Sequence, residues 1–520
     1  MPVTIKKIHL INFKRFSDYT IEPNKKINIL AGDNEVGKSS ILEAIDIVAS
    51  GNVRRVESVG IDRLLNIASV QQFLAAQHTF DALPKMIIEL YLDLHGFLDF
   101  TLNGKNNTSG IACDGIRLVC EANVDYRAEI EDSMRAQSDY FPYDYYSIRF
   151  STFADEGYSG YKKKLRTTLI DSSTMNSEYA TNDFIKRMYH QYTDNDAKER
   201  AVHRSKYRQL KESFRTGSLE ALNKRVSKYA FGLKMTAITE FENDLMIYED
   251  EIGIDNKGMG RQVFIKTDFA LERAGDNVDV ILLEEPENHL SHTNLRKLVQ
   301  LVSESQDGQL FITTHNSLIS TRLELQNVLL MGSPTEGVPT SLRALNEETS
   351  KYFMKAPVAN MMEFSISEQV ILVEGPSEYM LLARFYEAIT GQKPETDGVH
   401  IIDVHGLSFN RYLEVAQLLG NRVAVITDND KDRQKHCIDK YSAFAGIDTV
   451  QVFSETDDTK YTFEVVLYHA NKALCDKLFG DKALEYMLNN KTEAAYRLLL
   501  EDGDIQVPEY IQEAIKWIRE

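Results

Sequence analysis

The pattern G-x-x-x-x-G-K-[ST] is present in full at residues 32–39, Gly-Asp-Asn-Glu-Val-Gly-Lys-Ser. An apolar run at 27–31 precedes it and predicts a strand, and apolar periodicity from Ser40 onward predicts a helix. Glycines let backbone amides turn toward a phosphate, and a helix N-terminus adds positive partial charge. We therefore expect Lys38 to reach the outer phosphates of a nucleotide. The expected nucleotide-binding residues of this loop are Asn34, Gly37, Lys38, Ser39 and Ser40.

Two carboxylates follow a second apolar run. Residues 278–283 predict a buried strand that ends at Glu284 and Glu285. We expect Glu284, together with the Ser39 hydroxyl, to hold a hydrated Mg²⁺, and Glu285 to position or deprotonate the attacking water. The alternative is a buried strand that ends in a solvated acidic loop. Glu284 stands where most ATPases have Asp, which leaves the rate of hydrolysis open.

Two further motifs lie around this strand. Gly258 and Gly260 precede an apolar helix about 20 residues before the strand, and His315 follows another apolar run at 309–314. The glycines occupy the place of an ABC signature, whose backbone amides face the γ-phosphate held by a second protomer. His315 occupies the place of the switch histidine that senses this phosphate. The four motifs in this order predict an ABC-type ATPase fold that completes its sites as a dimer.

A second group of acids lies beyond the ATPase motifs. Apolar runs at 368–373 and 422–427 end in Glu-Gly-Pro-Ser-Glu and Asp-Asn-Asp, and a third run lies at 400–404. Strands that alternate with helices predict a parallel sheet with its site at the carboxyl ends of the strands. Carboxylates gathered there repel one another unless a hard cation such as Mg²⁺ or Mn²⁺ neutralises them. The acids concerned are Glu374, Glu378, Asp428 and Asp430.

The motifs resemble known families. The opening Ile-His-Leu-Ile-Asn-Phe-Lys-Arg-Phe resembles the ATPase heads of the chromosome-maintenance and recombination family, and the later E-G and D-x-D acids resemble the Toprim domain. The order of ABC head and then Toprim, with E-G-x-x-E and D-x-D, resembles the OLD (overcoming lysogenisation defect) family of nucleases. That family includes the Gabija nuclease subunit and related antiphage effectors. The resemblance covers most of the chain.

The resemblance implies roles for individual residues. It makes Glu374, Glu378, Asp428 and Asp430 ligands of catalytic metal ions. Thr462-Phe463-Glu464 resembles the family's T-L-E, which makes Glu464 a further ligand. Residues 489–495 resemble the stretch that supplies a catalytic lysine, so Lys491 is the candidate, with Lys460 as its rival. Residues 507–515 resemble the family's closing helix.

Length and composition limit the possible domain organisation and binding partners of the chain. A chain of 520 residues exceeds one ordinary core, and its formal net charge of -19 argues against indiscriminate nucleic-acid binding over the whole surface. There is no signal-peptide core and no run of 18 apolar residues, so we expect a cytoplasmic protein without a membrane partner. The four cysteines lack zinc spacing and are expected to be reduced thiols.

The expected fold class is α/β, an ABC-type P-loop ATPase domain with a helical insertion, followed by a C-terminal Toprim domain. Residues 186–234 carry 13 Lys/Arg against 5 Asp/Glu, so the insertion is either a dimerisation element or a basic arm for phosphate backbones, and the two roles are compatible. No Q-loop glutamine stands out, although Gln71 and Gln72 are candidates. The expected segments are 1–174 (first part of the ATPase), 175–250 (helical insertion), 251–345 (second part of the ATPase), 346–366 (connector) and 367–520 (Toprim domain).

The function expected from these features and the resemblance is an ATP-binding, Mg²⁺- or Mn²⁺-dependent endonuclease gated by its ATPase head. DNA is favoured over RNA as the substrate, and the resemblance implies antiphage defence. The expected partners are nucleic acid, further copies of the chain as a dimer or larger oligomer, and an accessory subunit such as a helicase or a reverse transcriptase with its nucleic acid. The alternative is an ATP-switched scaffold that binds nucleic acid but cuts poorly without a partner. A topoisomerase ranks last, because little chain remains for a DNA-gate domain.

Overall fold

A computed structural model describes residues 3–520 apart from 77–78, 137–140, 161–162, 172–177, 194–195, 235–239, 273–277, 305–307, 317–318, 320–321, 333–337, 357–359, 407 and 502. The chain forms two compact units. The first, here called the head unit, comprises Met1–Leu30, Asn34–Thr314 and Thr335–Pro339. The second, here called the C-terminal unit, comprises Ala31–Asp33, His315–Pro334 and Thr340–Glu520. The five segment boundaries predicted from the sequence stay predictions.

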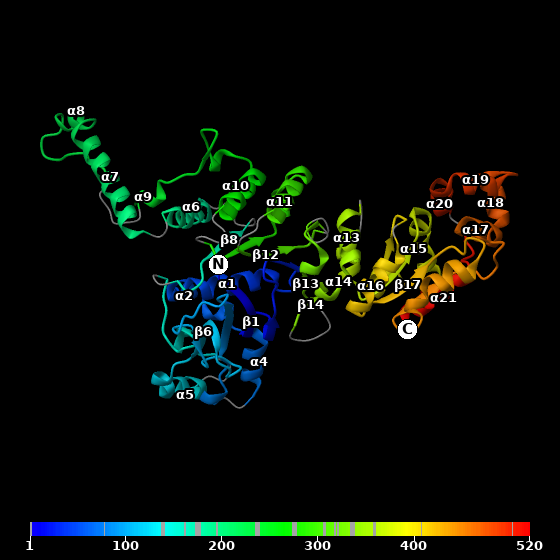
Figure 1. Cartoon of the computed structure of the whole chain (residues 1–520), viewed down its shortest axis with the longest axis horizontal. Coiled ribbons are helices and arrows are strands. Elements are labelled where there is room, and N and C mark those ends of the chain that lie inside the picture. The colour runs from blue at the N-terminus through cyan, green and yellow to red at the C-terminus, as the bar shows by residue number, and fades with distance from the viewer. Residues whose placement is uncertain are drawn as a thin grey trace. The chain divides into compact units, whose positions relative to one another are not determined.

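One sheet of the head unit is antiparallel, in the order β2-β1-β4-β6-β5 with β7 paired to β6 (Figure 1). Alternating side chains bury one face, as in β1, where Ile8 and Leu10 are fully buried. Alternating apolar residues at 3–16, 85–94 and 145–150 predict strands, which β1, β4 and β7 confirm, whereas β6 was not predicted. The bounds are β1 Thr4–Phe13, β2 Phe16–Ile21, β4 Met86–Asp93, β5 Asn103–Gly104, β6 Cys113–Ala122 and β7 Tyr146–Thr152.

The other sheet of the head unit carries the nucleotide motifs, with its strands in the order β3-β12-β11-β8. Strand β11 is parallel to both β12 and β8, so their carboxyl ends share one edge. The predicted strands at 27–31, 278–283 and 309–314 are confirmed, with β11 shifted to end at Glu284 itself. The bounds are β3 Ile27–Ala31, β8 Thr167–Asp171, β11 Val280–Glu284 and β12 Gln309–Thr314.

Helices pack on and extend from these sheets. Helix α1 (Lys38–Ser50) buries most of its side chains, including the aliphatic Ile41, Leu42 and Ile45. Helix α7 (Ala197–Thr216) buries none of its side chains. The other elements of the head are α2 Val53–Val59, α3 Ile61–Leu64, α4 Ile67–Ala75, α5 Arg127–Ala136, α6 Glu178–Tyr192, α8 Glu220–Asn223, α9 Glu240–Asn243, β9 Tyr248–Glu249, β10 Ile252–Gly253, α10 Met259–Glu272 and α11 His292–Glu304.

The C-terminal unit is built on a four-stranded, wholly parallel sheet in the order β16-β15-β17-β18. The bounds are β15 Gln369–Val373, β16 Val399–Asp403, β17 Arg422–Ile426 and β18 Val450–Phe453. The first three strands were predicted, and the parallel sheet is confirmed. Because all four strands point the same way, the acids that follow β15 and β17 lie at one edge.

Helices of the C-terminal unit cover this sheet (Figure 1). Helix α15 (Pro376–Thr390) begins at Pro376, because proline suits the first helical position, and this start places Glu378 in the first turn. The predicted closing helix is α21 (Glu509–Arg519), where Trp517 lies 4.1 Å from the guanidinium of Arg422. The other elements are β13 Val328–Leu330, β14 Thr340–Ser341, α13 Glu347–Lys355, α14 Met361–Ile366, α16 Phe409–Leu419, α17 Phe463–Ala470, α18 Lys472–Phe479, α19 Ala483–Asn489 and α20 Lys491–Leu499.

Candidate functional site

The phosphate-loop motif leads into α1 in the way its sequence predicts. Gly37 is the residue before the helix, with a φ of 95° that side chains rarely adopt. A Cβ atom at Gly37 would lie 2.5 Å from the ring Cζ of Phe16, so the position admits only glycine in this arrangement. Lys38 follows as the first residue of α1 and is buried. Asn34 lies in the turn between β3 and α1, and Ser39 and Ser40 lie in the first turn of α1.

Glu284 lies at the carboxyl end of β11, where the Ser39 hydroxyl forms a hydrogen bond with its side chain. Burial raises the pKa of Glu284, the bond from Ser39 lowers it, and the charges of Asp171 and Glu285 raise it further. A desolvated carboxylate crowded by other acids and next to a hydroxyl is a donor set that fits Mg²⁺, which takes oxygen ligands. The pair predicted to hold the nucleotide's metal ion is therefore brought together.

Glu285, the expected water-positioning residue, has a strained backbone with a φ of 38°. Its amide donates to the carbonyl and to the hydroxyl of Thr313, each 3.1 Å away, and these bonds hold the turn. The side-chain amide of Asn288 donates to Oε2 of Glu285 at 2.9 Å. Strain that is held by its surroundings is common at functional sites.

The signature glycines differ in their surroundings. Gly260 lies in the first turn of α10, and a Cβ atom there would stand 2.4 Å from the carbonyl oxygen of His289. Glycine therefore lets α10 approach the segment that follows Glu285. A Cβ atom at Gly258 would have no described neighbour within 4 Å. His315 follows directly after β12 and is exposed.

The sequence did not reveal the acid beside Glu284. Asp171 ends β8 and pairs in register with Glu284 of β11. Its strand, Thr-Thr-Leu-Ile-Asp, is short and half polar, so no apolar run marked it. The two Q-loop candidates, Gln71 and Gln72, lie exposed on α4.

The second group of acids meets at the carboxyl edge of the parallel sheet in the C-terminal unit. Glu374 follows β15, and its Oε1 accepts hydrogen bonds from the Thr427 hydroxyl at 2.5 Å and from the Asp428 amide at 3.1 Å. Oδ1 of Asp428 accepts a bond from the Phe463 amide at 2.7 Å. These bonds tie the E-G, D-x-D and T-F-E motifs to one another.

Glu378 and Glu464 join this edge from helices. Burial and the charges of Glu464 and Glu374 raise the pKa of Glu378 to about 7. Burial, followed by the charges of Glu374, Glu378 and Glu464, raises the pKa of Asp428 to about 8. Each pKa is raised because the carboxyl group is desolvated and lies close to other negative charges.

Lys491 is the cation at this edge. Its Nζ lies 2.9 Å from Oε2 of Glu464, which is buried in the first turn of α17. The rival lysine, Lys460, instead lies 3.8 Å from Asp457. Lys491 also lowers the pKa values of both Glu378 and Asp428, so it is close enough to act on the whole cluster.

Asp430 stands apart from the other predicted ligands, because it is exposed and is not among the charges that shift the pKa of Asp428. Asp430 and Lys431 have φ values of 47° and 69°, both in the left-handed region. The buried Asn429 holds this turn: its side-chain amide donates to the carbonyls of Glu455 and Asp457, each at 3.1 Å. Apart from its place inside D-x-D, no pattern in the sequence distinguishes Asn429.

The cluster fits a hard divalent cation by its chemistry. Its members are carboxylates whose mutual repulsion a cation would relieve. The Thr462 hydroxyl, one residue before the amide that binds Asp428, is buried without a hydrogen-bond partner among the described residues. In the described part of the chain, however, no three of these side chains already form a group that could hold a metal ion.

Two other features of the C-terminal unit were not foreseen. Tyr510 of α21 is buried, and the charges of Asp428 and Glu378 add to the burial that raises its pKa. His405 follows β16, and its Nδ1 lies 2.7 Å from Oδ2 of the buried Asp403. Tyr510 lies within residues 507–515, which predicted the closing helix, but the sequence predicted no role for Tyr510 or for His405.

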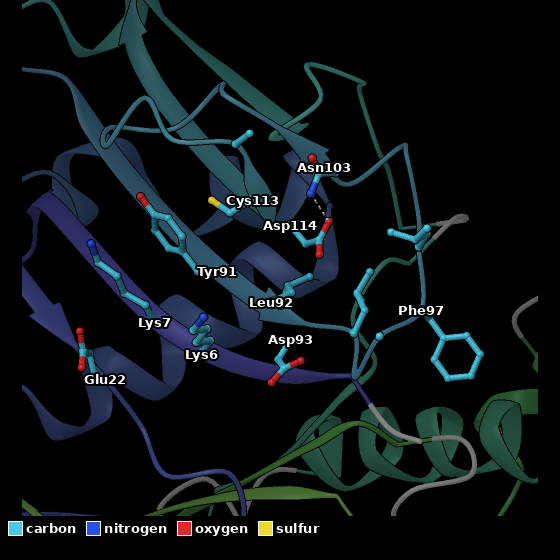
Figure 2. A pocket seen from close by; sticks show the side chains of 14 residues that line it. Lys6, Lys7, Glu22, Tyr91, Leu92, Asp93, Phe97, Asn103, Cys113 and Asp114 are labelled. Atoms are coloured by element: carbon cyan, nitrogen blue, oxygen red, sulfur yellow. Dashed lines mark hydrogen bonds between the residues drawn. The ribbon is translucent and has the colours of Figure 1, made fainter.

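A pocket of about 550 Å³ lies on the antiparallel sheet of the head (Figure 2). Lys6, Lys7, Tyr91, Asp93 and Cys113 are among its lining residues, and Lys7 Nζ stands 4.8 Å from the centre of the Tyr91 ring. Its lysines are balanced by acids, so its charge selects no class of ligand.

All four cysteines are free, as predicted. Within the described residues, no helix is long and apolar enough to cross a bilayer.

Comparisons with known proteins agree with the two sites. A model of the TOPRIM domain of overcoming-lysogenization-defect-like proteins matches residues 366–430. Models of AAA domains match residues 7–252 and 258–321, the second described as a putative AbiEii toxin of a type IV toxin–antitoxin system. The ATPase motifs and the E-G and D-x-D acids fall inside these matches.

Individual relatives match parts of the chain. Endonuclease GajA of Bacillus cereus (strain VD045) is 27% identical over 210 residues, which cover 38% of this chain and 36% of that protein. The chain thus spans about a third of that relative's length. The DNA replication and repair protein RecF of Idiomarina loihiensis is 45% identical over 47 residues, 9% of this chain and 13% of that protein.

Among solved structures, the C-terminal region of the Xanthomonas campestris pv. campestris OLD protein aligns with a TM-score of 0.22 and 17% identity, covering 29% of this chain and 94% of that one. The predicted α/β class, with an ATPase head and a C-terminal Toprim domain, is confirmed by the family matches. The chain is therefore similar to the OLD proteins, with AAA-type ATPase domains followed by an OLD-like Toprim domain.

Proposed function

We propose that this protein is an ATP-binding, divalent-metal-dependent endonuclease whose cleavage of DNA is gated by its ATPase head. One observation carries the proposal: Glu374, Glu378, Asp428 and Glu464 converge at one sheet edge with Lys491 beside them. Carboxylates pressed together with raised pKa values are typical of a site that holds cations. The similarity to endonuclease GajA supports the same reaction class.

The chain's own residues divide the work at this edge. Glu374, Glu378, Asp428, Asp430 and Glu464 would hold Mg²⁺ or Mn²⁺. The hydroxyl of Thr427 and the amide of Asp428 orient Glu374. Lys491 would release Glu464 and stabilise negative charge on the phosphorane or the leaving oxygen. When bound, the metal ions supply charge neutralisation and an activated water for phosphodiester hydrolysis.

The head would act as the gate. We propose that Lys38, Ser39, Glu284 and Glu285 bind and turn over ATP with Mg²⁺, and that Gly258, Gly260 and His315 complete the site in a homodimer or a larger oligomer. The protein would work in the cytoplasm as an antiphage effector, with an accessory subunit such as a helicase or a reverse transcriptase. The resemblance of the motifs to the OLD family, which includes antiphage effectors, supports the defence role.

One observation favours a second candidate function. Among the described carboxylates no group is already arranged to hold a metal ion, and Glu464 is engaged by Lys491. A protein in this state would bind nucleic acid and cut poorly until a partner rearranged the edge. That is the behaviour of an ATP-switched scaffold in a defence complex.

Plasmid cleavage tests the proposal directly. Supercoiled DNA is incubated with Mg²⁺ or Mn²⁺, with and without ATP, and with wild type, Asp428→Ala and Lys38→Ala. We expect wild type to nick or linearise the plasmid, Asp428→Ala to be inactive, and Lys38→Ala to lose only the response to ATP. Wild type that is inert alone but active with its neighbouring gene products would support the scaffold. Equal cleavage by wild type and Asp428→Ala would place the activity outside the Toprim domain.

A further inference from the structure

The most basic part of this acidic chain is the segment 197–234, here called the arm, which consists of α7, α8 and the return segment after them (Figure 1). It carries 11 Lys/Arg and 3 Asp/Glu, whereas the whole chain has a formal net charge of -19. Helix α7 buries no side chain. A positive helix without a buried side chain is available to an anionic partner.

Five of the seven Lys/Arg residues of α7 lie on one side of the helix. Positions three or four apart share a helix face, and this spacing occurs four times in succession. The resulting stripe, here called the basic stripe, consists of Arg200, Arg204, Arg208, Lys211 and Arg215. It extends over about 22 Å, with a cation roughly every 6 Å where the spacing is four residues. Phosphates follow one another every 3.4 Å of axis along one DNA strand, so the stripe can meet several of them.

The guanidinium groups of the stripe are largely uncommitted. Arg200, Arg204 and Arg208 form no ion pair with a described residue, and Arg215 pairs with Glu212 at the exposed surface. Exposed pairs of this kind contribute little and are readily exchanged for a phosphate. The two remaining lysines of α7, Lys198 and Lys206, lie on other faces of the helix and are exposed.

The arm has a defined structure. Asn223 closes its tip, since its side-chain amide donates to the Phe231 carbonyl at 3.0 Å and its Oδ1 accepts from the Phe231 amide at 2.7 Å. At the base, the Tyr189 hydroxyl lies 2.7 Å from Nδ1 of His203, and Tyr207 packs on Phe241 with ring centroids 5.4 Å apart. The basic stripe is thus presented on an ordered support.

Aromatic side chains are interleaved with the cations. Phe214, Tyr229 and Phe231 are exposed, and Lys228 Nζ lies 5.7 Å from the centre of the Tyr229 ring. Exposed aromatic rings among cations are found where proteins bind nucleic acid, because rings stack on bases while cations bind the backbone. The same rings could pair two copies of the arm, but a like-charged stripe opposes that association.

We propose that the arm is a nucleic-acid-binding element, in which the basic stripe binds the sugar-phosphate backbone. This inference depends on the proposed function in one respect: the nucleic acid that the arm binds is the substrate that the Toprim acids cleave. It assigns the head unit a direct role in substrate capture, separate from ATP binding.

The test compares two double variants of the full chain with the same change in charge. Arg204→Gln/Arg208→Gln removes two cations from the stripe, and Lys198→Gln/Lys206→Gln removes two from other faces of α7. Binding to a fluorescein-labelled DNA duplex and to a single strand is measured by anisotropy in EDTA across a range of NaCl concentrations. Circular dichroism checks that both variants keep their helix content.

We expect the stripe variant to weaken duplex binding roughly tenfold and to lower the slope of log K against log salt by about two, with a smaller effect from the control. An equal loss of DNA affinity in both variants would mean that only the net charge of α7 matters, and it would overturn the assignment of the basic stripe as the binding surface. Unchanged binding with a shift in oligomeric mass would make the arm a dimerisation element and would overturn it as well.

Hydrolysis of bis(4-nitrophenyl) phosphate with Mn²⁺ separates this inference from the proposed function, because so small a diester cannot span the arm. The stripe variant should hydrolyse it at the wild-type rate. If wild type hydrolyses no diester yet binds DNA through the stripe, the nuclease proposal fails and the arm proposal stands. If wild type cuts DNA and the stripe variant binds and cuts DNA equally well, the nuclease proposal stands and the arm proposal fails.

Discussion

Oε1 of Glu374 accepts a hydrogen bond from the backbone amide of Asp428, 3.1 Å away across 54 positions of sequence. The contact joins the acid that ends β15 to the acid that ends β17. It fixes the direction of the Glu374 carboxylate before any cation arrives, and it uses only one of the two carboxylate oxygens. The other oxygen remains for a ligand.

Replacement of Glu374 separates its structural role from its metal role. In Glu374→Gln the amide oxygen can still accept the bonds from Thr427 and Asp428, so the thermal midpoint should stay within about 2 °C. The negative charge is lost, and Mn²⁺ affinity measured by calorimetry should fall at least about tenfold. Glu368→Gln, at the amino end of the same strand, is the control and should bind Mn²⁺ as wild type does. Unchanged affinity in Glu374→Gln would remove this residue from the ligand set.

The D-N-D turn should depend on Asn429. Asn429→Ala leaves the carbonyls of Glu455 and Asp457 without their donor and leaves two left-handed residues unsupported. We expect a loss of about 2 kcal/mol in unfolding free energy and slower cleavage. Asn410→Ala removes one longer bond, 3.4 Å to the Lys440 carbonyl, and should cost less. Equal midpoints for the two variants in thermal unfolding would contradict this account.

The two signature glycines should respond differently to a methyl group. Gly260→Ala places Cβ against the His289 carbonyl, so α10 must shift, at a cost of about 1–3 kcal/mol. Gly258→Ala adds a methyl group in open space and should leave the thermal midpoint of the head unchanged. Differential scanning calorimetry of both variants tests the difference. A stable Gly260→Ala variant would mean that the close approach to His289 is not required.

Lys266 should make the head more stable as pH rises. Burial lowers its pKa to about 8, against the opposing charges of Asp255 and Asp171, while its Nζ donates to the Thr181 hydroxyl at 3.1 Å. The unfolded chain holds this proton up to its ordinary pKa of 10.5, so between pH 8 and 10.5 the unfolded state binds more protons and stability rises with pH. Below pH 8 the full cost of the buried charge remains.

Lys266→Met tests this sign. The variant should be more stable than wild type by about 2 kcal/mol at pH 7, and the difference should shrink toward pH 10. Urea unfolding at several pH values measures it, with the exposed Lys297→Met on α11 as a control that should show no such trend. A wild-type midpoint that does not rise between pH 8 and 10 would contradict the prediction.

The elements that sequence patterns predicted are those that carry their own local signal. Buried apolar runs marked β3, β11, β12, β15 and β17, and the acids that follow them marked the two strand edges. Strands β8 and β18 were missed because they are short and partly polar, and their stability comes from pairing with β11 and β17. Asp171 was missed together with its strand.

The site was predictable only as a set of residue types. The fold sets the side-chain directions by which Glu374 binds the Asp428 amide and Lys491 rather than Lys460 meets Glu464. The exposure of Asp430 likewise depends on the fold. The excess of positive charge near residue 200 was visible in the sequence. Its concentration on one face of α7 follows only once the helix is in place.

The distribution of the four thiols has a practical consequence. Cys120, Cys437 and Cys475 are buried, whereas Cys113, at the rim of the pocket in Figure 2, is partly exposed. Burial and the nearby carboxylates of Asp114 and Glu89 raise the pKa of Cys113, so its thiolate, the reactive form, is scarce at neutral pH. Mildly alkaline maleimide chemistry should therefore attach one dye to the natural chain, on the head, without mutagenesis. Such a dye would give single-molecule fluorescence a reporter on the ATPase half of the protein.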